Sequence, residues 1–311
     1  MRVTANTFPN SLLNQLSSLA TRQNRLQNQA ATGQRVQFPE DDPAAVRRTL
    51  DLKSESSSID QYKRNIASLS DSAKASYEVI SGLKTISDRA RELAIQGDGT
   101  KSLKQLQSYA SEVTQLIQQA VQLTNTKFAG NYLLSGTRSD QVPFVLSTNV
   151  TGEVTGVTYQ GNEAVAESEV SEGATLSAQT VGANSGGTGP RGLITDARFG
   201  ADFFNHLITL QNNLLSGDTA AIANATQPQL AKDEDNLVLH LGINGTVQAR
   251  LEALRSLSNR QTDSLEVRIS GEVDADLAQT LVQLGQTQSA YQAALQSGAK
   301  MLNQSLLDYI R

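Results

Sequence analysis

The sequence of 311 residues contains no cysteine and no tryptophan, and only 5% of its residues are aromatic. Without cysteine the chain can form no disulfide, thiolate nucleophile, iron–sulfur centre or Cys-ligated zinc site. The scarcity of aromatic side chains leaves few of the large flat groups that usually line small-molecule pockets. We therefore expect a core built from Leu, Ala, Ile and Val, without a cofactor pocket.

Charge is also scarce, since only 18% of the residues are charged, against about 25% in an average domain. Lys and Arg number 26 and Asp and Glu 31, which gives a net charge of −5. A mildly acidic chain is a poor candidate for binding nucleic acid phosphates. No apolar run approaches the roughly 18 residues that span a bilayer, and Met1–Asn10 lacks the apolar segment of an ordinary signal peptide. We predict no nucleic acid partner, no membrane partner and no cleaved signal peptide.

Motifs that carry chemistry are missing as well. His206 and His240 have no second ligand three or four residues away, so neither forms a zinc motif. The glycine run 186–189 lacks the Gly-Lys-Ser/Thr ending of a phosphate-binding loop, and no Gly-x-Ser-x-Gly elbow is present. The sequence predicts no enzyme, no catalytic residue, no cofactor and no metal. A binding module within residues 130–192 stays open as an alternative, although no aromatic cluster supports it.

Apolar residues near both ends of the chain alternate at spacings of four and three, which is the narrow seam of a coiled coil. The first seam lies within about residues 10–31 and the second within about residues 274–310. We expect the two helices to pair antiparallel and their seams to form the assembly interface. The predicted seam residues are Leu12, Leu16, Leu19 and Leu26, followed by Leu277, Leu281, Leu284, Tyr291, Leu295 and Leu302.

Turn and capping residues delimit these helices. Gly33 is a plausible C-cap of the first helix, and Asp41 or Asp42 can cap a second helix that begins with Pro43. Asp274 and Asp276 stand where first-turn carboxylates complement the dipole of the last helix. All four aspartates are predicted to be structural caps.

The middle of the chain changes character. Helical patterns cover about residues 43–96 and 102–128, resume at about 202 until an interruption at 216–218, and cover about 228–269, with a joint predicted at residues 270–272. Residues 130–192, in contrast, are rich in Gly, Ser, Thr and Val. Short strands are predicted at residues 143–146, 154–159, 164–166 and 175–176. The predicted fold is mainly α, a long-helix bundle with a small inserted β domain. Its segments are 1–42, 43–129, 130–200, 201–271 and 272–311, where the first and last form the coiled coil and 43–129 and 201–271 form the two halves of the bundle.

Both seams contain a glutamine, and Gly298 interrupts the second. Because isolated helices of this kind are marginal, we hypothesise that both ends are poorly ordered in the monomer and fold against other chains. An ordinary coiled-coil hairpin that is stable alone is the alternative.

The residues around these caps resemble those of a known family. Thr32-Gly33-Gln34-Arg35-Val36 followed by Glu40-Asp41-Asp42-Pro43-Ala44 resembles the N-terminal signature of bacterial flagellins, and Val273-Asp274-Ala275-Asp276-Leu277-Ala278 resembles their C-terminal motif. Within this family, the segment 130–144 and the ending Ser305-Leu306-Leu307-Asp308-Tyr309 are similar to the subunits that join the hook to the filament.

The resemblance implies a non-enzymatic structural subunit of the bacterial flagellum. It would assemble as a ring with copies of itself, between the first hook-associated junction protein on the hook side and flagellin on the filament side. It would be secreted through the flagellar type III export channel, after a chaperone binds its C-terminal helix. A flagellin-type filament subunit is the alternative function.

One further segment has two interpretations. Residues 89–96 resemble the flagellin helix segment that animal innate receptors recognise, with Arg89 and Leu93 as counterparts of its contacts. We favour the simpler interpretation, which is a packed helix end.

Overall fold

The computed structural model describes residues 7–97 and 99–309, together with the side chains of residues 10–97 and 99–300. Residues 1–6, which belong to the N-terminal segment predicted to lack a signal peptide, lie outside the described residues. So do residues 310 and 311. The helices are α1 (Thr7–Thr32), α2 (Pro43–Gln96), α3 (Leu103–Thr124), α4 (Phe203–Ser216), α5 (Thr219–Ala221), the π-helical turn η1 (Ile222–Thr226), α6 (Gln227–Val273) and α7 (Leu277–Tyr309). A mainly helical fold with a small β domain is confirmed.

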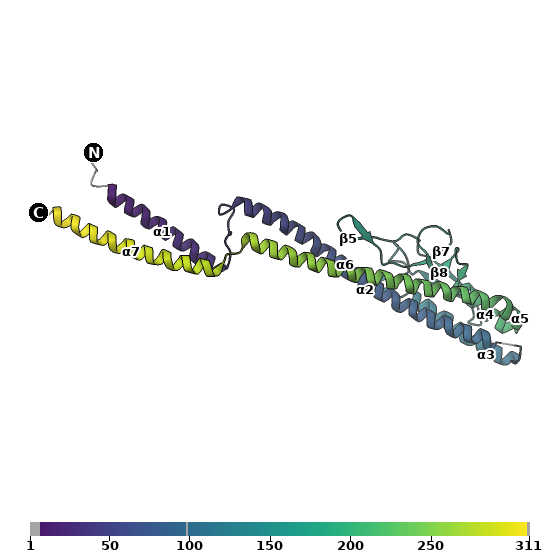
Figure 1. Cartoon of the computed structure of the whole chain (residues 1–311). Coiled ribbons are helices and arrows are strands. Elements are labelled where there is room, and N and C mark those ends of the chain that lie inside the picture. Colours follow the sequence, from purple (N-terminus) through teal and green to yellow (C-terminus); the bar gives the residue numbers. More distant parts are fainter. Residues whose placement is uncertain (1–6, 98, 310–311) are drawn as a thin grey trace. The chain divides into compact units, whose positions relative to one another are not determined.

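The chain divides into two compact units, one of residues 1–58 with 260–311 and the other of residues 59–259. Both boundaries fall inside the long helices α2 and α6. In the first unit α1 and α7 pack along each other and run antiparallel (Figure 1). The pairing of the two end helices therefore agrees with the antiparallel coiled coil that the sequence predicts.

The second unit has a helical core to which α2, α3, α4 and α6 all contribute. Its helices are delimited by local signals: Ser102 and Gln105 form a capping box at the start of α3, and Gly217 ends α4 in the left-handed conformation. The aliphatic periodicity places one apolar stripe of each helix in this core. Fully buried members include Ile80, Leu83, Leu93, Val113, Ile117, Leu207, Leu210 and Leu230.

The β region between α3 and α4 consists of small paired strands. Three antiparallel hairpins are β1–β2 (Lys127–Phe128, Asn131–Tyr132), β3–β4 (Phe144–Thr148, Val154–Tyr159) and β5–β6 (Ser168–Ser171, Ala174–Leu176). In a further sheet β7 (Val181–Asn184) runs parallel to β8 (Gly192–Asp196), which pairs antiparallel with β9 (Ala201–Asp202).

Three of the predicted strands overlap β3, β4 and β6, but the strand predicted at 164–166 is wrong. That segment is irregular, and its last amide, the N–H of Ala166, donates to Gln179 Oε1 instead of to a strand partner. The strand β5 starts two residues later. The helical pattern predicted to stop at 269 also continues, since α6 runs through residues 270–272 to Val273.

Two amide side chains attach β3 and β4 to the helical core. Asn125, which follows α3, donates to Phe144 O at 2.8 Å and accepts from its N–H at 3.0 Å. Gln211 on α4 bonds both the N–H and the C=O of Val154 in the same way. Each amide thus supplies one strand residue with the donor and the acceptor that a neighbouring strand would otherwise supply.

None of the helices within residues 7–97 and 99–309 is long and apolar enough to cross a membrane.

Candidate assembly interface

Two short connectors, residues 33–42 and 274–276, link the helices of the first unit, and an aspartate ends each connector. Asp42 Oδ1 accepts the N–H of Ala45 at 3.0 Å, and Asp276 Oδ1 accepts the N–H of Gln279 at 3.0 Å. Each carboxylate thus satisfies an otherwise unpaired amide in the first turn, of α2 and α7 respectively.

The other two predicted caps act before the helices. Asp41 Oδ2 accepts the N–H groups of Gln37 and Phe38 at 3.1 and 3.0 Å, and these bonds, with the nearby guanidinium of Arg25, hold the pKa of Asp41 below its usual value. Asp274 accepts the hydroxyl of Ser270 at 2.6 Å and forms a β-bridge with Gln34. Asp41 therefore shapes the first connector, and Asp274 joins the second connector to the first.

The connectors are bonded to each other through their backbones. The N–H of Arg35 donates to Val273 O at 2.7 Å, and the N–H of Ala275 donates to Gly33 O at 2.8 Å. Arg48 adds a bidentate ion pair to Glu272, at 2.9 and 2.8 Å, which lowers the pKa of that carboxyl. Both segments that lead to the end helices are thus held as one two-stranded ribbon.

The predicted seam residues of α7 differ in burial. The buried face contains Thr280, Thr287 and Gly298, and α1 is the element that packs along it. Leu284 and Tyr291 are half-buried at the edge of this face. Leu277, Leu281 and Leu295 are exposed, with 48%, 58% and 45% of their surfaces accessible.

The predicted seam of α1 points inward instead. Leu26 is buried, and Leu12, Leu16 and Leu19 are half-buried. The leucines of α1 thus face the helix pair, while Leu277, Leu281 and Leu295 of α7 stay on the surface of the isolated chain. Leu302 lies on α7 beyond the side chains that the structure describes.

Gly298 is the point of closest approach in this pair. A Cβ at this position would lie 2.5 Å from Leu12 Cδ2, so Leu12 fits against the bare backbone of α7. The interruption of the predicted seam is therefore a packing site for α1.

Replacing Gly298 with Leu is expected to separate α1 from α7 around Leu12. Overpacking of this kind costs about 1–3 kcal/mol, and hydrogen exchange of the α1 amides near Leu12 should become faster. Gly285→Leu is the matched control, because no atom lies within 4 Å of a Cβ at Gly285 in the same helix. Equal exchange in the two variants would contradict the packing described here.

In the second unit, the segment 130–144 has a structural role. Leu134 is fully buried, and the Tyr159 hydroxyl donates to its carbonyl at 3.0 Å, while the amide of Asn162 donates to Ser135 O. Burial raises the pKa of Tyr159 to about 12. The segment thus connects the helical core to the β region.

The segment 89–96 is a packed helix end in this structure. Arg89 pairs with Glu92 and with Glu112 on α3, and Arg91 pairs with Glu234 on α6. Leu93 is fully buried, so in the folded chain it offers no surface to a receptor.

Both histidines have polar partners that the sequence pattern did not reveal. His206 Nδ1 lies 2.7 Å from Asp233 Oδ2, and Asp233 is buried, so this pair joins α4 to α6. His240 Nε2 lies 3.1 Å from Gly192 O at the start of β8. These partners are 27 and 48 residues away in sequence, which is why local spacing could not predict them.

Acidification is expected to loosen the contact between α6 and β8. Burial lowers the pKa of His240, so the unfolded chain takes up a proton near pH 6.5 while the folded chain does not. Stability is therefore present above this pH and is lost as the pH falls through 6.5 toward the lowered pKa. His240→Gln should remove this part of the pH dependence in urea denaturation between pH 7.5 and 5; an unchanged pH dependence would contradict it.

Among the described residues, no group of three or more His, Asp or Glu side chains lies together in a way that could hold a metal ion. The features that stand out in the first unit are the helix pair, its exposed leucines and the bonded connectors.

Residues 3–139 match the family model of the bacterial flagellin N-terminal helical region. The chain is 23% identical over 302 residues to "Flagellar hook-associated protein 3" of Salmonella typhimurium, which covers 92% of each chain. These matches confirm the flagellin-type resemblance predicted from the sequence.

Solved structures show the same fold. A Vibrio parahaemolyticus structure assigned to the flagellar hook-associated proteins has a TM-score of 0.64 at 18% identity, covering 75% of this chain and 100% of that one. The flagellar junction protein FlgL from Legionella pneumophila has a TM-score of 0.53 at 16% identity, covering 74% and 100%. At this level of identity, these two likenesses describe fold alone.

Proposed function

We propose that this chain is a structural subunit of the bacterial flagellum, an adapter at the junction between hook and filament. The observation that carries the proposal is the match to hook-associated protein 3 along 92% of both chains. The junction-type segment 130–144 and the flagellin-type motifs at the two connectors support it. The role is non-enzymatic, and it depends on contacts between subunits.

We propose that the exposed leucines of α7, together with the seam of α1, form these contacts. Leu277, Leu281 and Leu295 are exposed along a single helix, and apolar surface of this kind in a soluble chain marks an interaction site. Adjacent copies would cover them by head-to-tail packing, which closes into a ring when the rotation between copies allows it.

The partners in this proposal are copies of the chain in a ring, the first hook-associated junction protein on one side and flagellin on the other. Export would use the flagellar type III channel, with a chaperone bound to α7 beforehand. The helix ends would gain order on assembly, and circular dichroism before and after assembly tests this: equal helical content would contradict it.

Deletion of the gene is expected to give cells that carry hooks but no filaments, with filament subunits shed into the medium. Electron microscopy of the cells and immunoblotting of the medium measure these two outcomes. Normal filaments on the deletion strain would contradict the proposal. If the purified chain grows long filaments from seeds, the alternative function as a filament subunit is correct instead.

A further inference from the structure

The first connector presents an exposed aromatic side chain in a fixed conformation. Phe38 is 58% exposed, more than any other phenylalanine whose side chain the structure describes. Asp41 holds the N–H groups of Gln37 and Phe38, and Pro39 restricts the chain directly after Phe38. Because the loop is already ordered, little conformational entropy is lost when a partner covers Phe38.

Two guanidinium groups share the surface around Phe38. Arg25 and Arg35 line the same hollow of about 250 Å³ as Phe38, at the end of α1. Each forms one ion pair, with Asp41 at 3.5 Å and Asp42 at 3.3 Å respectively. A guanidinium has five N–H donors, so both retain donors for a partner. Phenylalanine and arginine are both enriched at protein interfaces relative to the rest of the surface.

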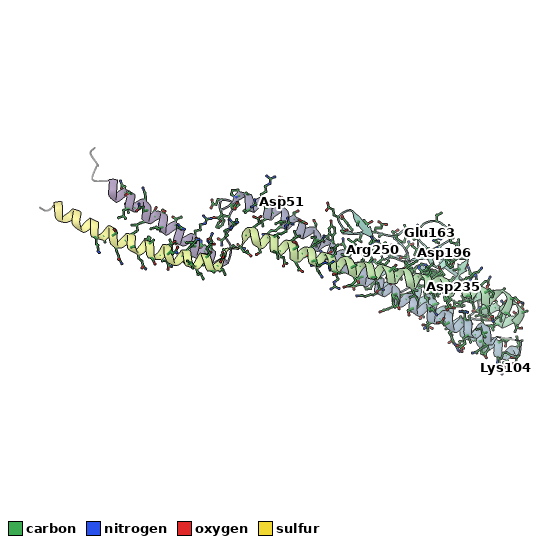
Figure 2. The ribbon with its side chains drawn as sticks, viewed as in Figure 1. Asp51, Lys104, Glu163, Asp196, Asp235 and Arg250 are labelled. Carbon is green, nitrogen blue, oxygen red and sulfur yellow. The ribbon has the colours of Figure 1, made fainter. Side chains whose placement is uncertain are left out.

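The first unit also contains a groove with complementary chemistry, of about 550 Å³, between α2 and α6. Leu52 lines it and is buried, Asp51 (Figure 2) and Glu55 supply carboxylates from α2, and Gly271 leaves α6 without a side chain there. The rest of the lining is Arg48, which pairs with Glu272, and Arg268, so two arginines and three carboxylates give the groove a net charge of −1. No atom lies within 4 Å of a Cβ placed on Gly271. Neither Asp51 nor Glu55 forms an ion pair with another described side chain.

We propose that Phe38 of one copy inserts into the groove between α2 and α6 of a neighbouring copy, with Arg25 and Arg35 facing Asp51 and Glu55. The inference rests on the proposed function, which requires contacts between copies of the chain. It specifies one of these contacts. The Phe38 surface and the groove have no residue in common, so one copy can use both at once. Such a contact is heterologous and therefore propagates from copy to copy.

The absence of cysteine makes cross-linking a clean test. One variant carries Glu40→Cys beside Phe38, and a second carries Gly271→Cys in the groove; both keep Phe38, the arginines and the carboxylates. The two variants are co-expressed in a deletion strain, flagella are isolated and treated with a short bismaleimide, and dimers of the chain are measured by immunoblotting. The purified full-length variants are mixed and cross-linked in parallel at high concentration.

We expect a dimer from the pair Glu40→Cys and Gly271→Cys. Adding Phe38→Ser to the first chain should reduce its yield at least fivefold. The matched control replaces Glu40→Cys with Val150→Cys, at a fully exposed position outside the first unit, and should give no dimer.

Three results would overturn the inference while leaving the proposed function intact. The chain could be present in flagella without giving the dimer, the dimer could persist at equal yield after Phe38→Ser, or Glu40→Cys could be joined to a different flagellar protein. If the chain is missing from flagella altogether, the proposed function fails. The yield of cross-linked dimer in the mixture of purified variants then tests by itself whether the two copies make this contact.

Discussion

Replacing Leu281 with Asp is expected to abolish incorporation into the flagellum without unfolding the chain. Leu281 is 58% exposed in the isolated chain, so the substitution removes little packing there. In an assembled contact it would remove about 1 kcal/mol of apolar burial and bury a carboxylate without a partner, which costs several kcal/mol more. Incorporation should fall by more than about 100-fold, and cells should swim no better than the deletion strain.

Quantitative immunoblotting of isolated flagella measures the incorporation of Leu281→Asp. Gln286→Asp is the matched control, because it adds the same charge at another exposed position of α7. The secreted variant should keep the thermal denaturation profile of the parent chain. Incorporation of Leu281→Asp at the parental level would show that this side of α7 does not contact another chain.

Replacing His206 with Leu is expected to cause a large loss of stability in the second unit. Asp233 is buried, and its carboxylate is held by His206 at 2.7 Å and by the N–H of Asp202 at 2.8 Å. Removing a partner that holds a buried carboxylate costs up to about 3–5 kcal/mol, because the carboxylate charge loses its compensation. Urea denaturation at pH 7, together with hydrogen exchange in α4, measures the effect.

The pH dependence of the His206→Leu variant identifies the cause. Burial raises the pKa of Asp233 above its usual value, and His206 opposes this rise. Without His206, Asp233 binds a proton more tightly in the folded chain, so stability should recover as the pH falls toward 5. The double variant with Asp233→Asn should recover most of the loss at pH 7. A loss that is independent of pH and persists in the double variant would indicate damaged packing instead.

Much of the fold could be predicted because its helices have local signals. The aliphatic periodicity and the residues Gly33, Asp42, Pro43 and Asp276 indicated where α1 stops and where α2 and α7 start, and the structure shows Asp42 and Asp276 bonded to first-turn amides. Such signals operate within a few residues, and a single sequence displays them directly.

The β region was harder to predict because its strands depend on distant partners. The strand β3 is held by Asn125, and β4 by Gln211 on α4, 57 residues further along the chain than Val154. The contacts of His206 with Asp233 and of His240 with Gly192 also join residues that are far apart in the sequence. Strand formation that depends on such contacts leaves no local pattern.

The seam of α7 was predicted from spacing alone, and spacing does not say which partner covers which side. The small residues at 280, 287 and 298 are buried, whereas Leu284 and Tyr291 are only half-buried. A pattern of leucines does not reveal that a stripe of threonine and glycine is the closer-packing face, because that choice depends on the side chains of α1.

The outer side of α7 has a consequence for the environments in which such a cell can swim. Residues 277–299 contain no Asp, Glu, Lys or Arg, so dissolved ions have no charges to screen along this stretch. The strength of a contact between chains that is formed by its leucines would therefore be nearly the same in fresh water and in brine. The ion pairs of Arg48 and Arg89 would weaken in brine, while the contact proposed for α7 would keep its strength.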